Sequence, residues 1–98
     1  MRFRFTNKDL EALFTQEKNA RRYPLAIVDA FAAVMTTLQA ALDVRELYKR
    51  HGLHFEKLKG DRLGQYSMRL NEQYRLIATL EEDAQGVIMV IHDIVDYH

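Results

Sequence analysis

Polar and aromatic residues alternate at the start of the chain, in residues 2–5. A period of two predicts a strand with one buried face. The period then changes, because Leu10 and Phe14 fall at helical spacing and Thr6 begins a stretch that resembles a helix capping box. We therefore expect a short strand and then a helix that opens at Thr6. In the polar and basic residues 16–22 this helix should fray or give way to a loop.

The longest apolar pattern covers residues 24–42, in which Asp29 is the only charged residue. Apolar side chains recur there at spacings of three and four, which predicts a helix with a wide apolar stripe. Pro24 suits the first turn of that helix, where its missing N–H costs nothing. We expect this to be the helix against which a sheet packs.

A short third helix is expected at residues 43–49. Asp43 and Glu46 have the spacing of a second capping box, and Gly52 ends the segment. After Gly52 the period returns to two, and the last apolar run has apolar residues on both faces, which is typical of a central strand. Strands are expected at residues 53–58, 66–70, 74–78 and 87–91, and turns at residues 60–64, 71–73 and 81–86.

Helices and strands are therefore segregated along the sequence, which predicts an α+β fold. It should consist of an N-terminal strand, a two-helix hairpin with a short third helix, and a three- to four-stranded antiparallel sheet. The helices should cover one face of the sheet, and the opposite face should be the functional one. Residues 1–98 are expected to form a single domain, because a chain of this length has room for one core.

Composition narrows the classes of function. The chain has no cysteine, which excludes disulfides and thiolate-based zinc sites. No apolar run approaches the roughly 20 residues that span a bilayer, and the first residues lack the apolar segment of a signal peptide. We expect a cytoplasmic protein without a membrane partner.

Charge is balanced overall but not along the chain. Residues 1–50 carry nine Lys and Arg against six Asp and Glu, and residues 51–98 carry five against eight. A domain that binds nucleic acid mainly by neutralising its backbone is usually more basic. The neutral net charge therefore counts against the hypothesis that the protein binds nucleic acid.

No metal or cofactor site is evident. None of the four histidines makes a pair with the helical spacing of a zinc site, and no glycine-rich phosphate loop is present. Asp93 and Asp96 are three apart on a strand, so they should point to opposite faces. His92 shares strand parity with Ile94, which predicts a packed or surface histidine rather than a catalytic one.

Two groups of cations are candidates for binding phosphate, although solvated surface cations are the commoner outcome for both. The first lies around the basic turn, and the second lies on the strands of the predicted hairpin. The terminal residues Asp96, Tyr97 and His98 could move protons, or they could form a disordered tail. The cations are Lys57, Lys59 and Arg62 in the turn, and Arg69 and Arg75 in the hairpin.

Four stretches of the second half together resemble the HigB branch of the RelE/ParE toxins, and the rest matches that branch in architecture and length. The resemblance implies a RelE-like fold and a ribosome-dependent mRNA endonuclease that uses the 2′-hydroxyl of the RNA as nucleophile, without a metal or cofactor. The stretches are residues 53–54, 58–67, 73–76 and 96–98.

The same resemblance implies roles for individual residues. Lys59 and Arg75 match residues that bind the phosphate, while His54 and residues 96–98 match residues credited with proton transfer and base contact. His98 or Asp96 would act as acid or base, and Tyr97 as a stacking platform or hydrogen-bond donor. Further RNA contacts are expected from Lys57, which could substitute for a displaced His54, and from Arg62, Arg69 and Gln73.

The implied partners are the ribosome, mRNA and a small helix-turn-helix antitoxin of the HigA type. Two other hypotheses for the function stay open. One is a non-catalytic toxin of the same superfamily that inhibits DNA gyrase, and the other is an inactive relative that acts as an interaction module. The nuclease reading makes a geometric prediction: Lys59, Arg75 and Tyr97 should share one concave surface, opposite the helix of residues 24–42.

Overall fold

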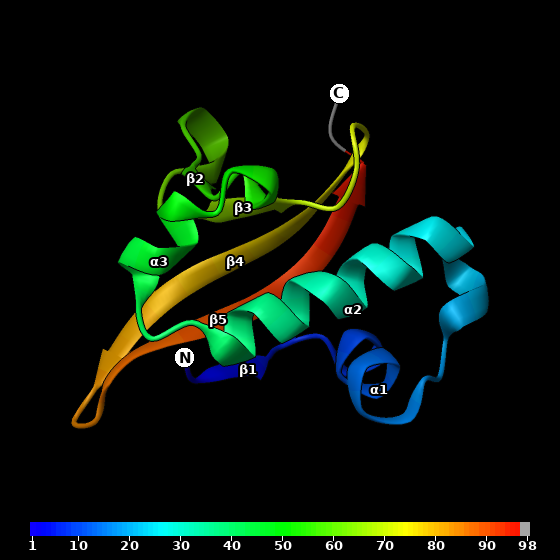
Figure 1. Cartoon of the computed structure of the whole chain (residues 1–98), viewed down its shortest axis with the longest axis horizontal. Coiled ribbons are helices and arrows are strands. Elements are labelled where there is room, and N and C mark those ends of the chain that lie inside the picture. Colours follow the sequence, from blue (N-terminus) through cyan, green and yellow to red (C-terminus); the bar gives the residue numbers. More distant parts are fainter. Residues whose placement is uncertain (97–98) are drawn as a thin grey trace.

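The structure, a computed structural model, describes residues 1–96 and contains three α-helices, three short 3₁₀ turns and five strands in that range (Figure 1). The helices are α1 (Lys8–Gln16), α2 (Leu25–Ala40) and α3 (Val44–Lys49), and the 3₁₀ turns are η1 (Ala20–Arg22), η2 (His51–Leu53) and η3 (Gly60–Arg62). The strands are β1 (Phe3–Phe5), β2 (Glu56–Lys57), β3 (Tyr66–Arg69), β4 (Tyr74–Asp83) and β5 (Gly86–Asp96).

All five strands form one sheet, in the order β1-β5-β4-β3-β2. Strands β2 to β5 are antiparallel neighbours, which confirms the predicted antiparallel sheet. β1 pairs in parallel with β5 and places β5 in the interior of the sheet. The alternation of residues 2–5 predicts a strand but does not identify its partner, so this parallel pairing was not predicted.

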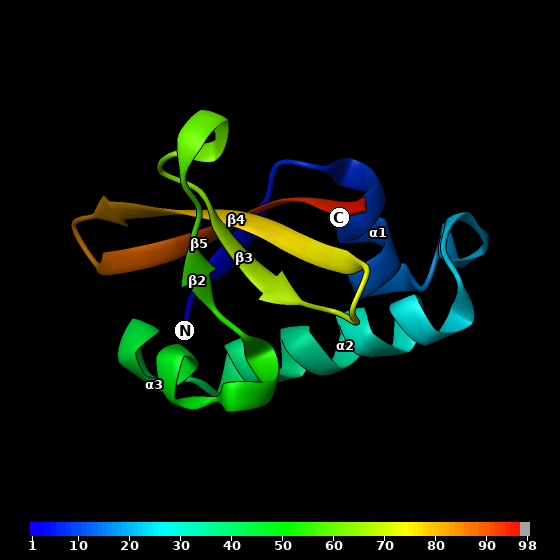
Figure 2. The same cartoon turned by 90° about the horizontal axis from the view of Figure 1, so that it is seen from above.

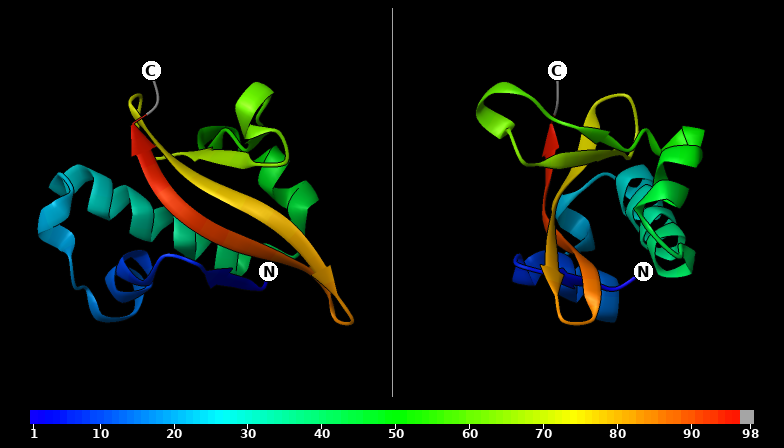
Figure 3. Two further views of the ribbon diagram at one scale, coloured as in Figure 1. Left: turned by 180° about the vertical axis from the view of Figure 1, so that it is seen from behind. Right: turned by 90° about the vertical axis from the view of Figure 1, so that its left-hand side faces the viewer.

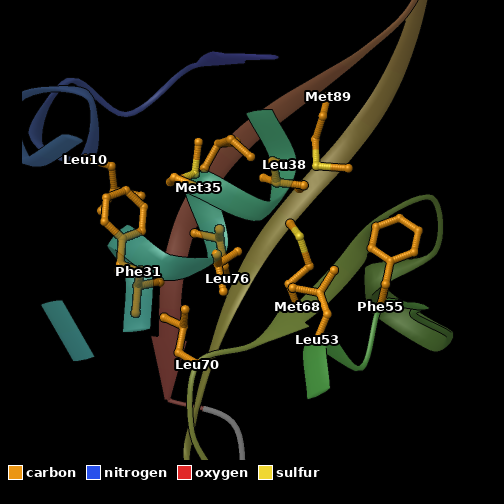
Figure 4. Close-up of a cluster of buried hydrophobic side chains, with 14 of the residues drawn as sticks. Leu10, Phe31, Met35, Leu38, Leu53, Phe55, Met68, Leu70, Leu76 and Met89 are labelled. Atoms are coloured by element: carbon orange, nitrogen blue, oxygen red, sulfur yellow. The ribbon is translucent and has the colours of Figure 1, made fainter. Parts of the chain in front are cut away.

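The helices cover one face of the sheet, as predicted for the α+β fold. Figure 4 shows the side chains of α1, α2, β3, β4 and β5 that meet in this core. Burial of this apolar surface is the main force that holds the chain together, at about 25 cal/mol per Å². The labelled residues are Leu10, Phe31, Met35, Leu38, Leu53, Phe55, Met68, Leu70, Leu76 and Met89.

The first helix begins one residue later than predicted, because Asn7 and not Thr6 is its N-cap. The Asn7 side chain accepts hydrogen bonds from the backbone N–H groups of Asp9 at 3.0 Å and Leu10 at 3.2 Å. Thr6 instead prolongs the edge of the sheet, since its N–H donates to the carbonyl of Ile91 at 3.0 Å. Two adjacent residues could have capped the helix, and the pairing of β1 with β5 decides between them.

The boundaries of α2 also differ slightly from the prediction. Pro24 is the N-cap with extended backbone, not a residue of the first turn, and the helix ends at Ala40. Asp43 caps α3 as predicted, because its side chain accepts from the N–H of Glu46 at 3.2 Å. The return bond of the capping box is shifted by one residue: the Glu46 carboxylate accepts from the N–H of Leu42 at 3.0 Å, and not from that of Asp43.

Gly52 was predicted to end the third helix, but α3 ends earlier, at Lys49. Gly52 lies inside the turn η2, and the left-handed residue that redirects the chain is His54, with φ of 47°. Leu53 and Phe55 on either side of it are both buried in the core. The tight turn at His54 lets two nearly adjacent apolar side chains reach the same core.

The predicted acidic loop at residues 81–86 is mostly strand. β4 runs to Asp83 and β5 starts at Gly86, which has φ of 111°. Arg2 forms an ion pair with Asp83 at 2.7 Å, and Arg4 forms one with Glu81 at 2.8 Å. These contacts neutralise part of the acidic run, which allows the hairpin to continue where the sequence predicted a loop.

A β-bulge interrupts β5 at His92. Ile77 pairs with Asp93 and the next residue, Ala78, pairs with Ile91, so His92 has no partner on β4. As a result Ile91 and Ile94 both belong to the core although they are three residues apart. The prediction that His92 shares a face with Ile94 is therefore wrong.

Candidate functional site

Arg75 lies on the face of the sheet opposite α2. It pairs with Arg69 on β3 and with Val95 on β5, and its neighbour Leu76 points into the core. Because side chains alternate along a strand, the guanidinium of Arg75 is directed to the side without helices. The hairpin thus brings the two arginines together, as predicted.

The turn between β3 and β4 holds Arg75 in place. The side-chain oxygen of Asn71 accepts from the backbone N–H groups of Gln73 at 2.8 Å and Tyr74 at 2.7 Å. The carbonyl oxygen of Asn71 accepts from Nη1 of Arg75 at 2.5 Å. Asn71 therefore organises both the turn and the cation beside it. Sequence analysis did not single out Asn71, although asparagine at the first position of a turn is an available signal.

Asp96 is brought to the same end of the sheet by the pairing of β5 with β4. It lies opposite Tyr74, and its Oδ2 atom accepts a hydrogen bond from Nε2 of Gln73 at 2.9 Å. Tyr74 packs against the core, so Asp96 shares the parity of the helix-covered face. It faces away from Arg75, and Asp93 shares the parity of Ile77 on the other face. The prediction that Asp93 and Asp96 point to opposite faces is consistent with this register.

Arg69 and Glu72 add one ion pair to this region, with Arg69 Nη2 and Glu72 Oε1 3.7 Å apart. At that separation the pair is loose, and exposed pairs of this kind contribute at most about 1 kcal/mol. Arg69, Gln73, Arg75 and Asp96 are thus the predicted site residues that the sheet gathers at one end.

The basic turn projects from the opposite edge of the sheet. Figure 2 shows η3 on the side of the sheet away from α2 and α3. Gly60 and Gly64 bracket the turn with φ of 66° and 89°, a region that favours glycine. Lys59 precedes η3 and is exposed, and Arg62 donates from Nη1 to the side chain of Gln65 at 3.1 Å. The turn and Arg75 therefore lie on the same side of the sheet.

His54 and Lys57 are placed differently. His54 follows η2, which lies with α3 on the helix-covered side (Figure 2). Lys57 pairs with Tyr66, which packs against the core, so it has the parity of that side as well. Neither residue is joined to Arg75 by any contact in the described part of the chain. Tyr97 and His98 lie outside the described residues, so the predicted surface shared by Lys59, Arg75 and Tyr97 stays a prediction.

Four grooves measured on residues 1–96 lie away from this end of the sheet, and none of the four is lined by Lys59, Arg75 or Asp96. One of them, of about 790 Å³, lies around Met1, Leu42 and Val87. Residues 1–96 also contain no group of three or more His, Asp or Glu side chains placed to hold a metal ion.

No helix in the described part of the chain is long and apolar enough to cross a membrane. A family model described as the RelE-like toxin of the type II toxin–antitoxin system HigB matches residues 3–98. The toxin HigB-1 of Vibrio cholerae serotype O1 is 36% identical to the chain over 77 residues, which are 79% of this chain and 81% of that protein.

Two solved structures share the fold. A YoeB/ParE toxin from Agrobacterium tumefaciens superposes with a TM-score of 0.58 and 16% identity, covering 100% of both chains. A chain of the toxin–antitoxin complex RelBE2 from Mycobacterium tuberculosis superposes with a TM-score of 0.53 and 21% identity, covering 98% of this chain and 96% of that one.

Proposed function

Because this chain belongs to the HigB family of RelE-like toxins of type II toxin–antitoxin systems, we propose that it is an endoribonuclease that cuts mRNA on the translating ribosome. The family membership confirms the resemblance read from the sequence. The catalytic step and its dependence on the ribosome are the proposal, and they rest on the placement of Arg75 and Asp96.

The proposed reaction is an intramolecular transesterification. The 2′-hydroxyl of one nucleotide attacks the adjacent phosphorus, the 5′-oxygen of the next nucleotide leaves, and a 2′,3′-cyclic phosphate forms. The step needs a base for the 2′-proton, an acid for the leaving oxygen and cations for the charge that develops on the phosphorane.

Arg75 is the proposed cation at the phosphorane. Its guanidinium is held by the carbonyls of Asn71 at 2.5 Å and Tyr74 at 3.2 Å, and a planar guanidinium can bind two phosphate oxygens at once. Preorganised donors of this kind are typically worth about 100- to 1,000-fold in rate. Lys59, on the same side of the sheet, is proposed as a second cation.

Asp96 or His98 is proposed to move the protons, with Tyr97 as a stacking platform or hydrogen-bond donor. The hydrogen bond of 2.9 Å from Gln73 orients the Asp96 carboxylate at the end of β5. Gln73 is thus proposed to position Asp96 in addition to its predicted contact with RNA. The observation that carries the proposal is that the pairing of β4 with β5 brings Gln73, Arg75 and Asp96 to one end of the sheet, where Gln73 contacts Asp96 and Arg75 lies on the other face.

An antitoxin partner follows from membership in a type II toxin–antitoxin family. Two solved structures with this fold are toxin–antitoxin complexes, RelBE2 of Mycobacterium tuberculosis and YoeB–YefM of Staphylococcus aureus. We propose a small helix-turn-helix antitoxin for this chain. The family match favours the nuclease over the alternative of a gyrase inhibitor.

The test is to express the chain in cells and to map mRNA 5′ ends, and then to repeat the experiment with Asp96→Ala, His98→Ala and a C-terminal extension. In-frame cleavage of codons by the wild type, lost in the variants, is the expected result. Growth arrest with intact mRNA would contradict the nuclease and favour a gyrase-type toxin. Absence of any effect would leave an inactive interaction module.

A further inference from the structure

The basic charge of the chain is concentrated in one segment, residues 49–62. This segment carries five Lys and Arg against two acids, a net charge of +3, whereas the rest of the chain carries nine against twelve, a net charge of −3. The neutral total thus combines a basic segment with an acidic remainder. We call residues 49–62 the basic belt.

The cations of the basic belt have no carboxylate partner among the described residues. All five ion pairs of that part of the chain involve arginines outside the belt, which are Arg2, Arg4, Arg22, Arg45 and Arg69. Inside the belt, Lys49, Arg50, Lys57 and Lys59 are all exposed. Charges left unpaired and exposed in one segment create a positive potential that attracts a polyanion.

The belt runs around the β2 edge of the sheet. Figures 2 and 3 show its first part, from the end of α3 through η2, on the helix-covered side and its last part, η3, on the opposite side. On the helix-covered side, Lys49, Arg50 and His51 line a groove of about 560 Å³ whose wall includes Val34 and Leu53. The belt therefore connects a cationic groove to the side of the sheet on which Arg75 lies.

Three aromatic rings lie across this edge. Phe55 stacks on Tyr66 with ring centres 5.2 Å apart and an interplanar angle of 6°, and Tyr48 meets Phe55 edge-on at 4.9 Å. Phe55 is buried, but Tyr48 is 52% exposed. Lys57 is the register partner of Tyr66, and Lys49 follows Tyr48 in sequence. Cations thus flank the aromatic row at both ends.

We propose that the basic belt binds a strand of RNA, with Tyr48 as a stacking platform and Lys49, Arg50 and Lys57 on the phosphates. An exposed aromatic ring beside a row of cations is a combination with which proteins bind single-stranded nucleic acid. An acidic protein segment would use the cations but would leave the exposed ring of Tyr48 without a role. The inference rests on the proposed function, because the strand would belong either to the mRNA next to the cleaved codon or to ribosomal RNA.

The test uses the full chain with Lys49→Gln/Arg50→Gln and, separately, Tyr48→Leu and Tyr48→Phe. The control is Lys8→Gln/Lys18→Gln, which removes two exposed cations without ion pairs from the α1 region. Binding is measured at several salt concentrations to ribosomes with mRNA, to vacant ribosomes, to a free single-stranded oligonucleotide and to the cognate antitoxin. Circular dichroism and thermal unfolding establish that each variant folds.

We expect Lys49→Gln/Arg50→Gln to weaken ribosome binding about tenfold or more and to reduce the slope of log K against log salt by about two. Tyr48→Leu should weaken binding by about tenfold, and Tyr48→Phe, which keeps the ring, should bind like the wild type. Single-turnover cleavage at saturating toxin should be unchanged in all belt variants. A loss with vacant ribosomes identifies ribosomal RNA, and a loss only with programmed ribosomes or the oligonucleotide identifies the mRNA strand.

Three results would overturn the proposal. In the first, the belt and control variants bind RNA equally well. In the second, the belt variants lose affinity only for the antitoxin, which would make the belt a protein interface. In the third, Tyr48→Phe fails as Tyr48→Leu does, which would exclude stacking. If Tyr48→Leu does not fold, the binding of Lys49→Gln/Arg50→Gln and of Tyr48→Phe still tests the proposal. Because binding is measured apart from cleavage, a wild type that does not cut RNA contradicts the nuclease proposal separately.

Discussion

Gln73 joins the start of β4 to the end of β5 through its hydrogen bond of 2.9 Å to Asp96. These residues are 23 positions apart in the sequence, and only the antiparallel register of β4 and β5 brings them together. The adjacent register pair places Arg75 beside Val95, on the other face. The proposed proton-transfer group and the proposed phosphate ligand therefore occupy neighbouring rows at one end of the sheet.

Asp96→Asn should abolish most cleavage while it preserves the fold. The amide cannot accept or deliver the proton in the way a carboxylate does, and loss of a general acid or base costs about 100- to 10,000-fold. The measurement is the single-turnover rate of mRNA cleavage on programmed ribosomes. Gln73→Ala, which removes only the orienting contact, should have a much smaller effect. An Asp96→Asn variant with the wild-type rate would show that another group moves the proton.

Arg75→Gln should lower the cleavage rate about 100- to 1,000-fold, because the developing phosphorane charge loses a preorganised donor. Arg75→Lys should restore only part of the activity, since an ammonium group cannot bind two oxygens in one plane. The matched control is Arg69→Gln on the paired strand, which should affect ribosome binding more than the rate. Equal losses in the two variants would mean that Arg75 acts through general charge and not at the reacting phosphate.

The Arg2–Asp83 pair predicts a pH dependence of stability. The hydrogen bond from Arg2 lowers the pKa of Asp83 from its ordinary value of 3.8 to about 2. A carboxyl with a lowered pKa in the folded state stabilises the protein above its ordinary pKa, and this contribution is lost as pH falls toward the lowered value.

Asp83→Asn should therefore be less stable than the wild type at pH 6, and the difference should vanish as the pH approaches 2. Urea unfolding at a series of pH values measures this directly. Glu82→Gln is the control, because Glu82 is exposed and forms none of the ion pairs of the described residues. A difference between the wild type and Asp83→Asn that is constant with pH would contradict the assignment.

Local patterns in the sequence predicted most elements but not their exact limits or partners. The apolar stripe of residues 24–42 and the alternation of residues 66–70 are strong periodic signals, and both elements are present. The cap at Asn7 and the extension of β4 to Asp83 depend on contacts with β5 and β1. Contacts between distant segments cannot be read from one segment's own pattern, which explains these differences.

The candidate site was predictable to the same degree. A hairpin at residues 71–73 necessarily brings Arg69 and Arg75 together, so their pairing followed from local sequence. The placement of His54 and Lys57 on the helix-covered side depends on a left-handed residue and on the parity of a two-residue strand. Neither feature could be read from the sequence, because histidine adopts a positive φ only occasionally, although more often than most residues, and a strand of two residues has no periodic pattern.

The bulge at His92 places one extra residue in β5. His92 contacts Thr6 through Nδ1 at 2.9 Å and Thr79 through Nε2 at 2.8 Å, so it links β5 to β4 and to the residue that follows β1. His92→Ala should cost about 1–2 kcal/mol of unfolding free energy, since two hydrogen bonds are lost at a partly accessible position where water can replace them. Cleavage activity should remain, because the backbone register is preserved.

Deletion of His92 should leave the site in place. Ile91 would then be followed directly by Asp93, and because these two residues already pair with the adjacent Ala78 and Ile77, the ladder becomes regular without a change of register. Ile94 therefore stays opposite Leu76, and Asp96 stays opposite Tyr74 within reach of Gln73. Urea unfolding and single-turnover cleavage should show that both variants are destabilised but active. A deletion variant that folds but does not cleave would show that the local twist of the bulge, and not the register alone, orients the site.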